Sequence, residues 1–153
     1  MAINYMEIAN IVSKASKDMN TKVGAVIVSK DNRILSTGYN GAPRKYPDSL
    51  VPTSREGNWR ETKYPYICHA ELNAILNYRG SLADFKDATI YCTLFPCNEC
   101  AKALAQVGIS TVIYKSDKHH NDDIYIVSRE ILDKCEVKYY ECIWKWKSHK
   151  IKR

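Results

Sequence analysis

The chain has 153 residues and a formal net charge of +6, with 45% hydrophobic and 26% charged residues. This length suits one domain, and the ordinary globular composition argues against a wholly disordered chain. No apolar run approaches the roughly 18 residues that a membrane-spanning helix needs, and no signal peptide opens the sequence, so we expect no membrane partner and a cytoplasmic location.

Successive segments of the sequence place hydrophobic residues at helical or strand spacing, and this pattern predicts alternating helices and strands. A helix over 4–18 is followed by a hairpin of two strands with its turn at Asp31-Asn32. In order, the expected strands are 21–29, 34–39, 88–94, 111–114 and 137–144, and the later helices are 70–78, one that follows Pro96, and 122–134. This alternation predicts an α/β sandwich in which only the first strand pair is antiparallel.

A long irregular stretch separates the hairpin from the second helix. Residues 40–66 contain four prolines, two glycines and charges of both signs. Irregular segments of this length in a compact domain are commonly functional or disordered. We therefore expect this loop to contribute to a site or to an interface.

The positive charge is concentrated near the C-terminal end of the sequence. Residues 145–153 hold five Lys and Arg residues and no acid, and subtracting these five charges from +6 leaves +1 for residues 1–144. We interpret 1–144 as a single domain and 145–153 as a basic tail. Because the body is nearly neutral, the net charge is poor evidence for nucleic-acid binding. The alternation of Trp144 and Trp146 with lysines is compatible both with base stacking and with the end of a strand.

Two short segments hold the residues that suggest chemistry: His69-Ala70-Glu71, and the P-C-x-x-C run at 96–100. One imidazole and two thiolates suit Zn²⁺, and three protein ligands leave a tetrahedral position open for water, as in catalytic sites. Glu71 is close enough to His69 to exchange a proton with that water without binding the metal. The pairing of H-x-E with P-C-x-x-C is the signature of zinc deaminases. A structural zinc site, the main alternative, would need a fourth Cys or His nearby.

Several further stretches resemble the deoxycytidylate (dCMP) deaminases of the cytidine deaminase-like superfamily. The resemblance covers roughly residues 10–135 and rests on SKASKDMNTKVGAVIV, GYNGAP at 38–43, KYPYICHAELNAILN at 63–77, LFPCNECAK at 94–102 and YKSDKHHNDD at 114–123. It implies a three-layer α/β/α sandwich with a five-stranded mixed sheet. It also implies assembly of the subunits into a homo-oligomer, a hexamer.

The resemblance implies a role for each candidate site residue. His69, Cys97 and Cys100 would hold one catalytic Zn²⁺, and Glu71 would shuttle protons. Asn40 would contact the sugar of the nucleotide, and the backbone N–H of Ala70 would meet the pyrimidine O2. Candidates for contacts to the 5′-phosphate, chosen because they lie near strand ends, are Lys22, Lys115, Ser116 and Lys118.

The implied reaction is hydrolytic deamination of dCMP to dUMP and ammonia, which supplies dUMP for dTMP synthesis. A zinc-activated hydroxide would attack C4 while Glu71 protonates N3. The resemblance also implies dCTP as activator and dTTP as inhibitor, with Mg²⁺ on the triphosphate. Residues 44–60 depart from the family's acidic run, which leaves a bifunctional dCMP/dCTP deaminase open. A tRNA deaminase and a non-catalytic structural zinc module are the remaining alternatives.

Overall fold

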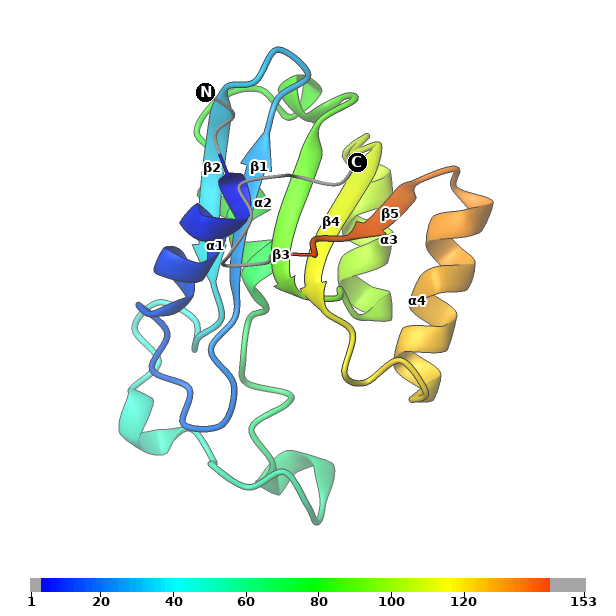
Figure 1. The fold of residues 1–153 in the computed structure, drawn as a ribbon. Helices are drawn as coiled ribbons and strands as arrows, with labels where there is room; N and C mark the ends of the chain where they lie inside the picture. Colours follow the sequence, from blue (N-terminus) through cyan, green and yellow to red (C-terminus); the bar gives the residue numbers. More distant parts are fainter. Residues whose placement is uncertain (1–3, 144–153) are drawn as a thin grey trace.

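One mixed sheet organises the protein, and its five strands lie in the order β2-β1-β3-β4-β5. The structure is a computed structural model that describes residues 4–143 (Figure 1). The strands are β1 Gly24–Val28, β2 Ile34–Tyr39, β3 Thr89–Leu94, β4 Thr111–Ser116 and β5 Lys138–Glu141. The α-helices are α1 Tyr5–Ser13, α2 Ala70–Asn77, α3 Asn98–Gln106 and α4 Asp123–Lys134. The expected basic tail at 145–153 lies outside the described residues.

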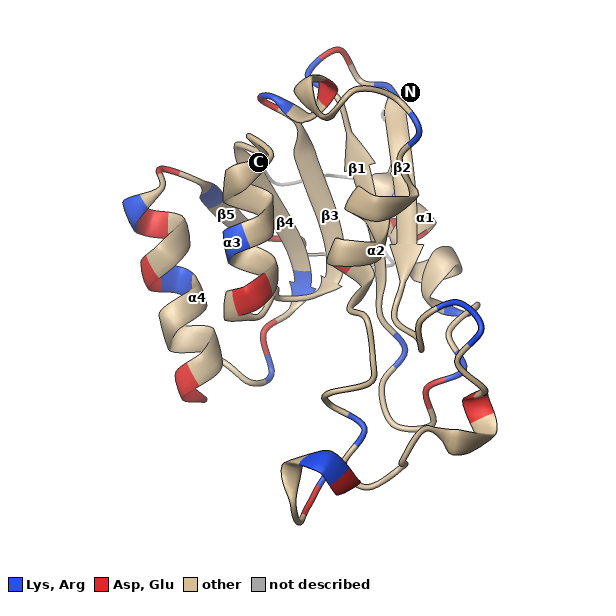
Figure 2. Ribbon diagram, turned by 180° about the vertical axis from the view of Figure 1, so that it is seen from behind, with Lys and Arg blue, Asp and Glu red and all other residues tan. Residues whose placement is uncertain are grey.

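Helices cover both faces of the sheet: α1 lies on one face, and α2, α3 and α4 lie on the other (Figures 1 and 2). All five residues of strand β1 are buried, so both faces of the sheet must be covered at this strand. Side chains alternate between the two faces of a strand. Thus Ala25 and Ile27 belong to the large core that includes residues of α2 and α3, whereas Val26 and Val28 pack with residues of α1. The expected three-layer α/β/α sandwich with a five-stranded mixed sheet is confirmed.

The expectation of a single antiparallel pair is wrong, because β1 is antiparallel to both of its neighbours. On the β3 side, Ala25 pairs with Cys92 and Val28 with Thr89, while β3, β4 and β5 pair in parallel. A strand that is apolar on both faces belongs in the middle of a sheet. After α2 the chain returns to the sheet, and β3 pairs with β1 on the side away from β2. Strand β2, the hairpin partner of β1, is therefore an edge strand.

The first helix ends at Ser13, earlier than the expected residue 18, because local hydrogen bonds compete with the helix. The Ser16 hydroxyl donates to the carbonyl oxygen of Asn40 at 2.8 Å. The Asp18 carboxylate accepts hydrogen bonds from the backbone N–H groups of Asn20 and Thr21, at 2.8 and 3.0 Å. These bonds turn the chain between α1 and β1 into a structured loop.

Acidic and basic residues are interspersed on the surface of the part of the chain that the structure describes. Helices α3 and α4 and the long loop after β2 each carry both signs (Figure 2). This distribution agrees with the nearly neutral charge of residues 1–144. Between residues 4 and 143, no helix combines the length and apolarity needed to cross a membrane.

Gly38 allows α2 to lie directly against β2. A Cβ at Gly38 would lie 2.3 Å from both the carbonyl oxygen of Ala70 and the amide nitrogen of Ala74. Since these are backbone atoms of a helix, the clash can be relieved only by moving α2. We expect Gly38→Ala to lower the free energy of unfolding by about 2 kcal/mol or more in urea denaturation.

Gly41→Ala is the matched control, because a Cβ at Gly41 would meet nothing within 4 Å. We expect it to change the free energy of unfolding by less than about 0.5 kcal/mol. Equal destabilisation by the two substitutions would contradict the steric explanation.

Candidate active site

The candidate site lies where the carboxyl ends of β2, β3 and β4 meet the amino end of β1 (Figure 1). Asn40 directly follows β2, and Cys97 follows β3 after the two-residue connection Phe95-Pro96. The segment that enters β1 passes the same edge because β1 runs in the opposite direction. The sheet thus collects side chains from distant parts of the sequence at one edge.

Two helix N-termini place the three candidate metal ligands. His69 is the N-cap residue of α2 and Cys97 is the N-cap residue of α3, both with extended backbone, and neither side chain bonds to its own helix. Cys100 lies in the first turn of α3. The imidazole and the two thiols are therefore free to face one another, at helix ends whose positive dipoles favour thiolates.

The three side chains form one compact cluster. His69 Nδ1 lies 3.3 Å from Cys97 Sγ and 3.7 Å from Cys100 Sγ, and one ligand atom from each residue lies within 4.8 Å of the others. Among residues 4–143 this is the one such group of three or more potential His, Cys, Asp or Glu ligands. Cys68 lies beside His69 in the chain but is not part of the group. The cluster therefore offers three ligands and not four.

Within the cluster, the neighbouring side chains favour the thiolate form of Cys97. A hydrogen bond from the thiol of Cys100 is the main cause that lowers the pKa of Cys97, and the hydrogen bond and charge of His69 add to it. Together they lower this pKa to about 4. The pKa of Cys100 is raised because its thiol donates to Cys97. Contact with Cys97 also raises the pKa of His69 to about 9. A His/Cys/Cys set that already stabilises one thiolate fits Zn²⁺ with one position left open.

Glu71 lies in the first turn of α2 and is 4% exposed. Burial raises the pKa of its carboxyl above the ordinary value, while His69 opposes the shift. The Glu71 side chain lines a cavity of about 140 Å³ together with His69 and Cys97. A carboxyl group with a raised pKa beside a cluster of candidate metal ligands is suited to general acid–base catalysis.

A pair of backbone hydrogen bonds places Asn40 beside the cluster. The N–H of Gly41 donates to the carbonyl of Cys68 at 3.1 Å, and the N–H of Cys68 donates to the carbonyl of Gly41 at 2.8 Å. This bridge closes the loop 42–67 at its base and sets the adjoining residues Asn40 and His69 next to each other. The Asn40 side chain accepts from the N–H of Val23 at 2.8 Å and donates to the carbonyl of Thr21 at 2.9 Å.

The structure brings together only part of the predicted site. The cavity of about 140 Å³ is lined by His69, Glu71 and Cys97 as well as by Asn40 and Ala70. Four predicted residues do not line this cavity: the candidate phosphate contacts Lys22, Lys115, Ser116 and Lys118. Lys115 donates to Asn10 of α1 at 3.0 Å, on the face of the sheet opposite α2 and α3. The assignment of phosphate contacts to these four residues stays a prediction.

Other cavity residues carried no signal of their own in the sequence. Arg55 and Lys63 come from the loop 42–67, and His119 and Tyr125 come from the segment between β4 and the first turn of α4. Tyr125 is partly buried, and this burial raises its pKa, so its phenol stays protonated. Only the resemblance of the stretches around Lys63 and His119 to a known family could have drawn attention to them.

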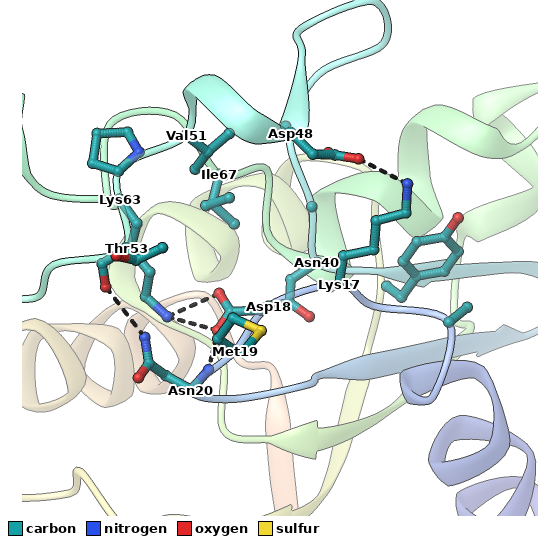
Figure 3. A pocket seen from close by; sticks show the side chains of 15 residues that line it. Lys17, Asp18, Met19, Asn20, Asn40, Asp48, Val51, Thr53, Lys63 and Ile67 are labelled. Carbon is teal, nitrogen blue, oxygen red and sulfur yellow. Dashed lines mark hydrogen bonds and ion pairs between the residues drawn. The ribbon is translucent and has the colours of Figure 1, made fainter.

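A second cavity, of about 280 Å³, is lined by the residues drawn in Figure 3. Four residues line both cavities: Asp18, Asn40, Lys63 and Ile67. The Lys63 ammonium donates to both oxygens of Asp18, at 2.9 and 2.8 Å, with the two side chains 11% and 3% exposed. Burial alone would raise the pKa of Asp18, but hydrogen bonds from Lys63 and from backbone N–H groups outweigh it and lower the pKa. This ion pair is part of the wall between the cavities.

Comparison with known proteins identifies the family. Residues 2–116 match the sequence model described as the cytidine and deoxycytidylate deaminase zinc-binding region. The deoxycytidylate deaminase of Homo sapiens is 44% identical over 140 residues, which cover 91% of this chain and 78% of that protein. The chain belongs to the cytidine and deoxycytidylate deaminase family. The expected resemblance to deoxycytidylate deaminases is thereby confirmed.

Further relatives support this membership. The deoxycytidylate deaminase of Mus musculus is 48% identical over 120 residues, which cover 78% of this chain and 66% of that protein. The crystal structure of dCMP deaminase from the cyanophage S-TIM5 in complex with dCMP and dUMP has a TM-score of 0.68 at 26% identity, covering 90% of this chain and 93% of that one. The expectation that this deaminase-family chain is an enzyme, and not a structural zinc module, is confirmed.

We expect the buried pair between Asp18 and Lys63 to stabilise the protein. Asp18→Asn leaves the Lys63 ammonium without its countercharge in a site where it is 11% exposed. The free energy of unfolding at pH 7 should fall by about 2 kcal/mol, less than for a fully enclosed pair because cavity water screens the charges. Since folding lowers the pKa of Asp18, this difference from wild type should shrink as the pH falls below about 4.

Urea denaturation at several pH values measures both effects. Asp48→Asn is the matched control, because Asp48 pairs at 2.7 Å with Lys17 on the surface, where the side chains are 56% and 80% exposed. Its loss should have little effect on stability. Equal effects of the two substitutions, or a difference that does not change with pH, would show that the Asp18 pair is not stabilising.

Proposed function

We propose that this chain deaminates dCMP to dUMP and ammonia, and thereby supplies dUMP for dTMP synthesis. The observation that carries the proposal is the buried carboxyl of Glu71 beside a three-ligand His/Cys/Cys cluster in the wall of one cavity. The choice of substrate is supported by relatives named deoxycytidylate deaminase and by the cyanophage homologue that binds dCMP and dUMP.

His69, Cys97 and Cys100 would hold one Zn²⁺, as their donor set and spacing allow. When bound, the metal supplies Lewis acidity that makes hydroxide available from water near neutral pH. The chain's own contribution is to hold the ligand side chains at two helix N-termini beside the cavity. Mg²⁺ finds no comparable set of ligands between residues 4 and 143.

Glu71 moves the protons of the reaction. Its carboxylate takes a proton from the attacking water and delivers it to N3 as the water oxygen bonds to C4. Glu71 then passes the remaining proton, from the hydroxyl now on C4, to the amino group; the C4–N bond breaks, the C4 carbonyl of dUMP forms, and ammonia leaves. Because burial raises its pKa, the carboxyl of Glu71 holds a proton more readily than an exposed glutamic acid. This property suits a group that must accept a proton and return it.

Two neighbouring groups would orient the nucleotide. Ala70 is the first residue of α2, so its N–H has no partner within the helix and is available to the pyrimidine O2. Asn40 retains one amide hydrogen and one oxygen lone pair after its bonds to Thr21 and Val23, and these can meet the sugar. Both groups are fixed by backbone contacts and need little reorganisation on binding.

The second cavity is our candidate site for the effectors dCTP and dTTP. Asp48, Val51 and Thr53 bring the divergent segment 44–60 into its wall. The residues shared with the catalytic cavity give a direct route for coupling, since an effector that shifts them also shifts the catalytic wall. The hexamer remains a prediction from the resemblance, and the cytoplasmic location remains a prediction from the sequence pattern.

Turnover should require Glu71. We expect Glu71→Gln to reduce kcat for ammonia release from dCMP by about 10³-fold, because the proton shuttle is lost while the metal ligands remain. Glu99→Gln is the control: Glu99 also lies in the first turn of a site helix, but its side chain is 72% exposed and pairs with Lys102.

The assay uses zinc-loaded protein, with metal content measured for each variant, and dCMP, dCTP, deoxycytidine and cytidine as substrates. Loss of turnover on chelation and its return with Zn²⁺ would support the metal's role. A zinc-loaded wild type that releases no ammonia from dCMP would refute the proposed reaction. An active Glu71→Gln variant would refute the role of Glu71 alone, and turnover of dCTP would favour the bifunctional alternative.

Effector control should depend on the second cavity. We expect dCTP to raise and dTTP to lower the rate at subsaturating dCMP, and Val51→Trp to abolish both responses by filling the cavity. Leu50→Trp is the control, because Leu50 is 64% exposed and does not line the cavity. If neither nucleotide changes the wild-type rate, or if both variants respond normally, this regulatory proposal is wrong.

A further inference from the structure

We propose that Arg55, supported by the hydroxyl of Thr21, binds the 5′-phosphate of the substrate and makes the enzyme selective for the nucleotide over the nucleoside. This inference rests on the proposed function, because it assigns a subsite within the same cavity. It replaces the candidate lysines, which do not line that cavity.

The exposure of the cavity residues defines where the phosphate must lie. Glu71 and Cys97 are buried at 4% and 7% exposure, and Asn40 is buried at 6%. Thr21 is half-buried and Arg55 is exposed. Since C4 of the base must reach the metal cluster, the 5′-phosphate at the opposite end of the nucleotide must point toward the exposed end of the cavity, where Arg55 lies.

A short hydrogen-bond chain links the proposed sugar contact to Arg55. The Asn40 side chain donates to the carbonyl oxygen of Thr21 at 2.9 Å. The Arg55 guanidinium donates through Nη2 to the hydroxyl oxygen of Thr21 at 3.2 Å. Thr21 therefore links the Asn40 side chain, which would meet the sugar, to the guanidinium of Arg55. This order matches the nucleotide, in which the phosphate directly follows the sugar.

Arg55 also has the free charge that the phosphate needs. Two permanent cations line the cavity, and Lys63 is already neutralised by the buried carboxylate of Asp18. Among residues 4–143, no carboxylate forms an ion pair with Arg55. Its only side-chain hydrogen bond within this range is the one to Thr21. The remaining N–H donors of the guanidinium can form the forked contact that phosphate oxygens favour.

His119 is the rival phosphate ligand, because it lines the same cavity. Its ring stacks on Tyr125 with centroids 5.6 Å apart, and its Nδ1 lies 3.5 Å from the Asp122 carboxylate. A neighbouring carboxylate competes with a phosphate for any positive charge on the imidazole. The charges therefore favour Arg55 over His119.

The test compares a nucleotide with its nucleoside in each variant. We expect Arg55→Ala to lower kcat/KM for dCMP by about 10- to 100-fold and to leave kcat/KM for deoxycytidine within about 2-fold of wild type. Arg55→Lys should recover part of the loss, and Thr21→Val should give a smaller selective loss. Arg60→Ala is the matched control, because Arg60 belongs to the same loop but does not line the cavity.

Calorimetric binding of dUMP and deoxyuridine provides a second readout that does not depend on turnover of the nucleoside. Arg55→Ala should weaken dUMP binding alone, with zinc content and melting temperature unchanged. Equal losses for nucleotide and nucleoside, no loss at all, or a selective loss in His119→Ala but not in Arg55→Ala would overturn the inference. A wild type that does not deaminate dCMP refutes the proposed function instead, so the two failures are distinguishable.

Discussion

The candidate active site depends on the backbone bridge between Gly41 and Cys68. Helix α2 packs against β2 along Gly38, but the chain between the two elements is a long, irregular loop, and the bridge joins its two ends. The bridge fixes both at one point, so that Asn40 and His69 adjoin and the loop between them folds back over the cluster. The sheet supplies Cys97 and Cys100 from the other side through β3. Neither the start of α2 nor the segment after β3 alone contains all three candidate metal ligands.

The bridge is not strong enough to close the loop alone. Bringing together the two ends of a loop of this length costs roughly 3 kcal/mol in entropy, and two backbone hydrogen bonds return about 1 kcal/mol each. Side-chain bonds to the same junction make up the difference: Asn73 of α2 donates to the carbonyl of Tyr39 at 2.8 Å, and Ser16 donates to the carbonyl of Asn40 at 2.8 Å. These two polar side chains therefore help to hold the backbone of the site in place.

The parts of this structure that could be predicted from the sequence are those with local signals. His69, Glu71, Cys97 and Cys100 stand out because their spacing matches a pattern typical of zinc sites built at the starts of helices. The pairing of β1 with β3 was missed because it joins distant segments, and nothing within β1 says which neighbour lies on its second side. Arg55 was missed for a related reason: its position follows from the closure of loop 42–67 and from the hydroxyl of Thr21, which the local sequence does not encode.

The ion pair of Asp18 and Lys63 has a structural reason to be buried. A buried ion pair adds little net stability compared with well-packed apolar residues, so its value lies in what it positions. Asp18 holds the N–H groups of Asn20 and Thr21, and Thr21 in turn contacts both Asn40 and Arg55. Lys63 belongs to the loop that the bridge closes. The pair therefore ties the entry to β1 to that loop at the wall shared by the two cavities. A ligand in either cavity would then meet side chains whose positions are fixed by the same ion pair, and this common wall would be the route for the coupling that we propose between the cavities.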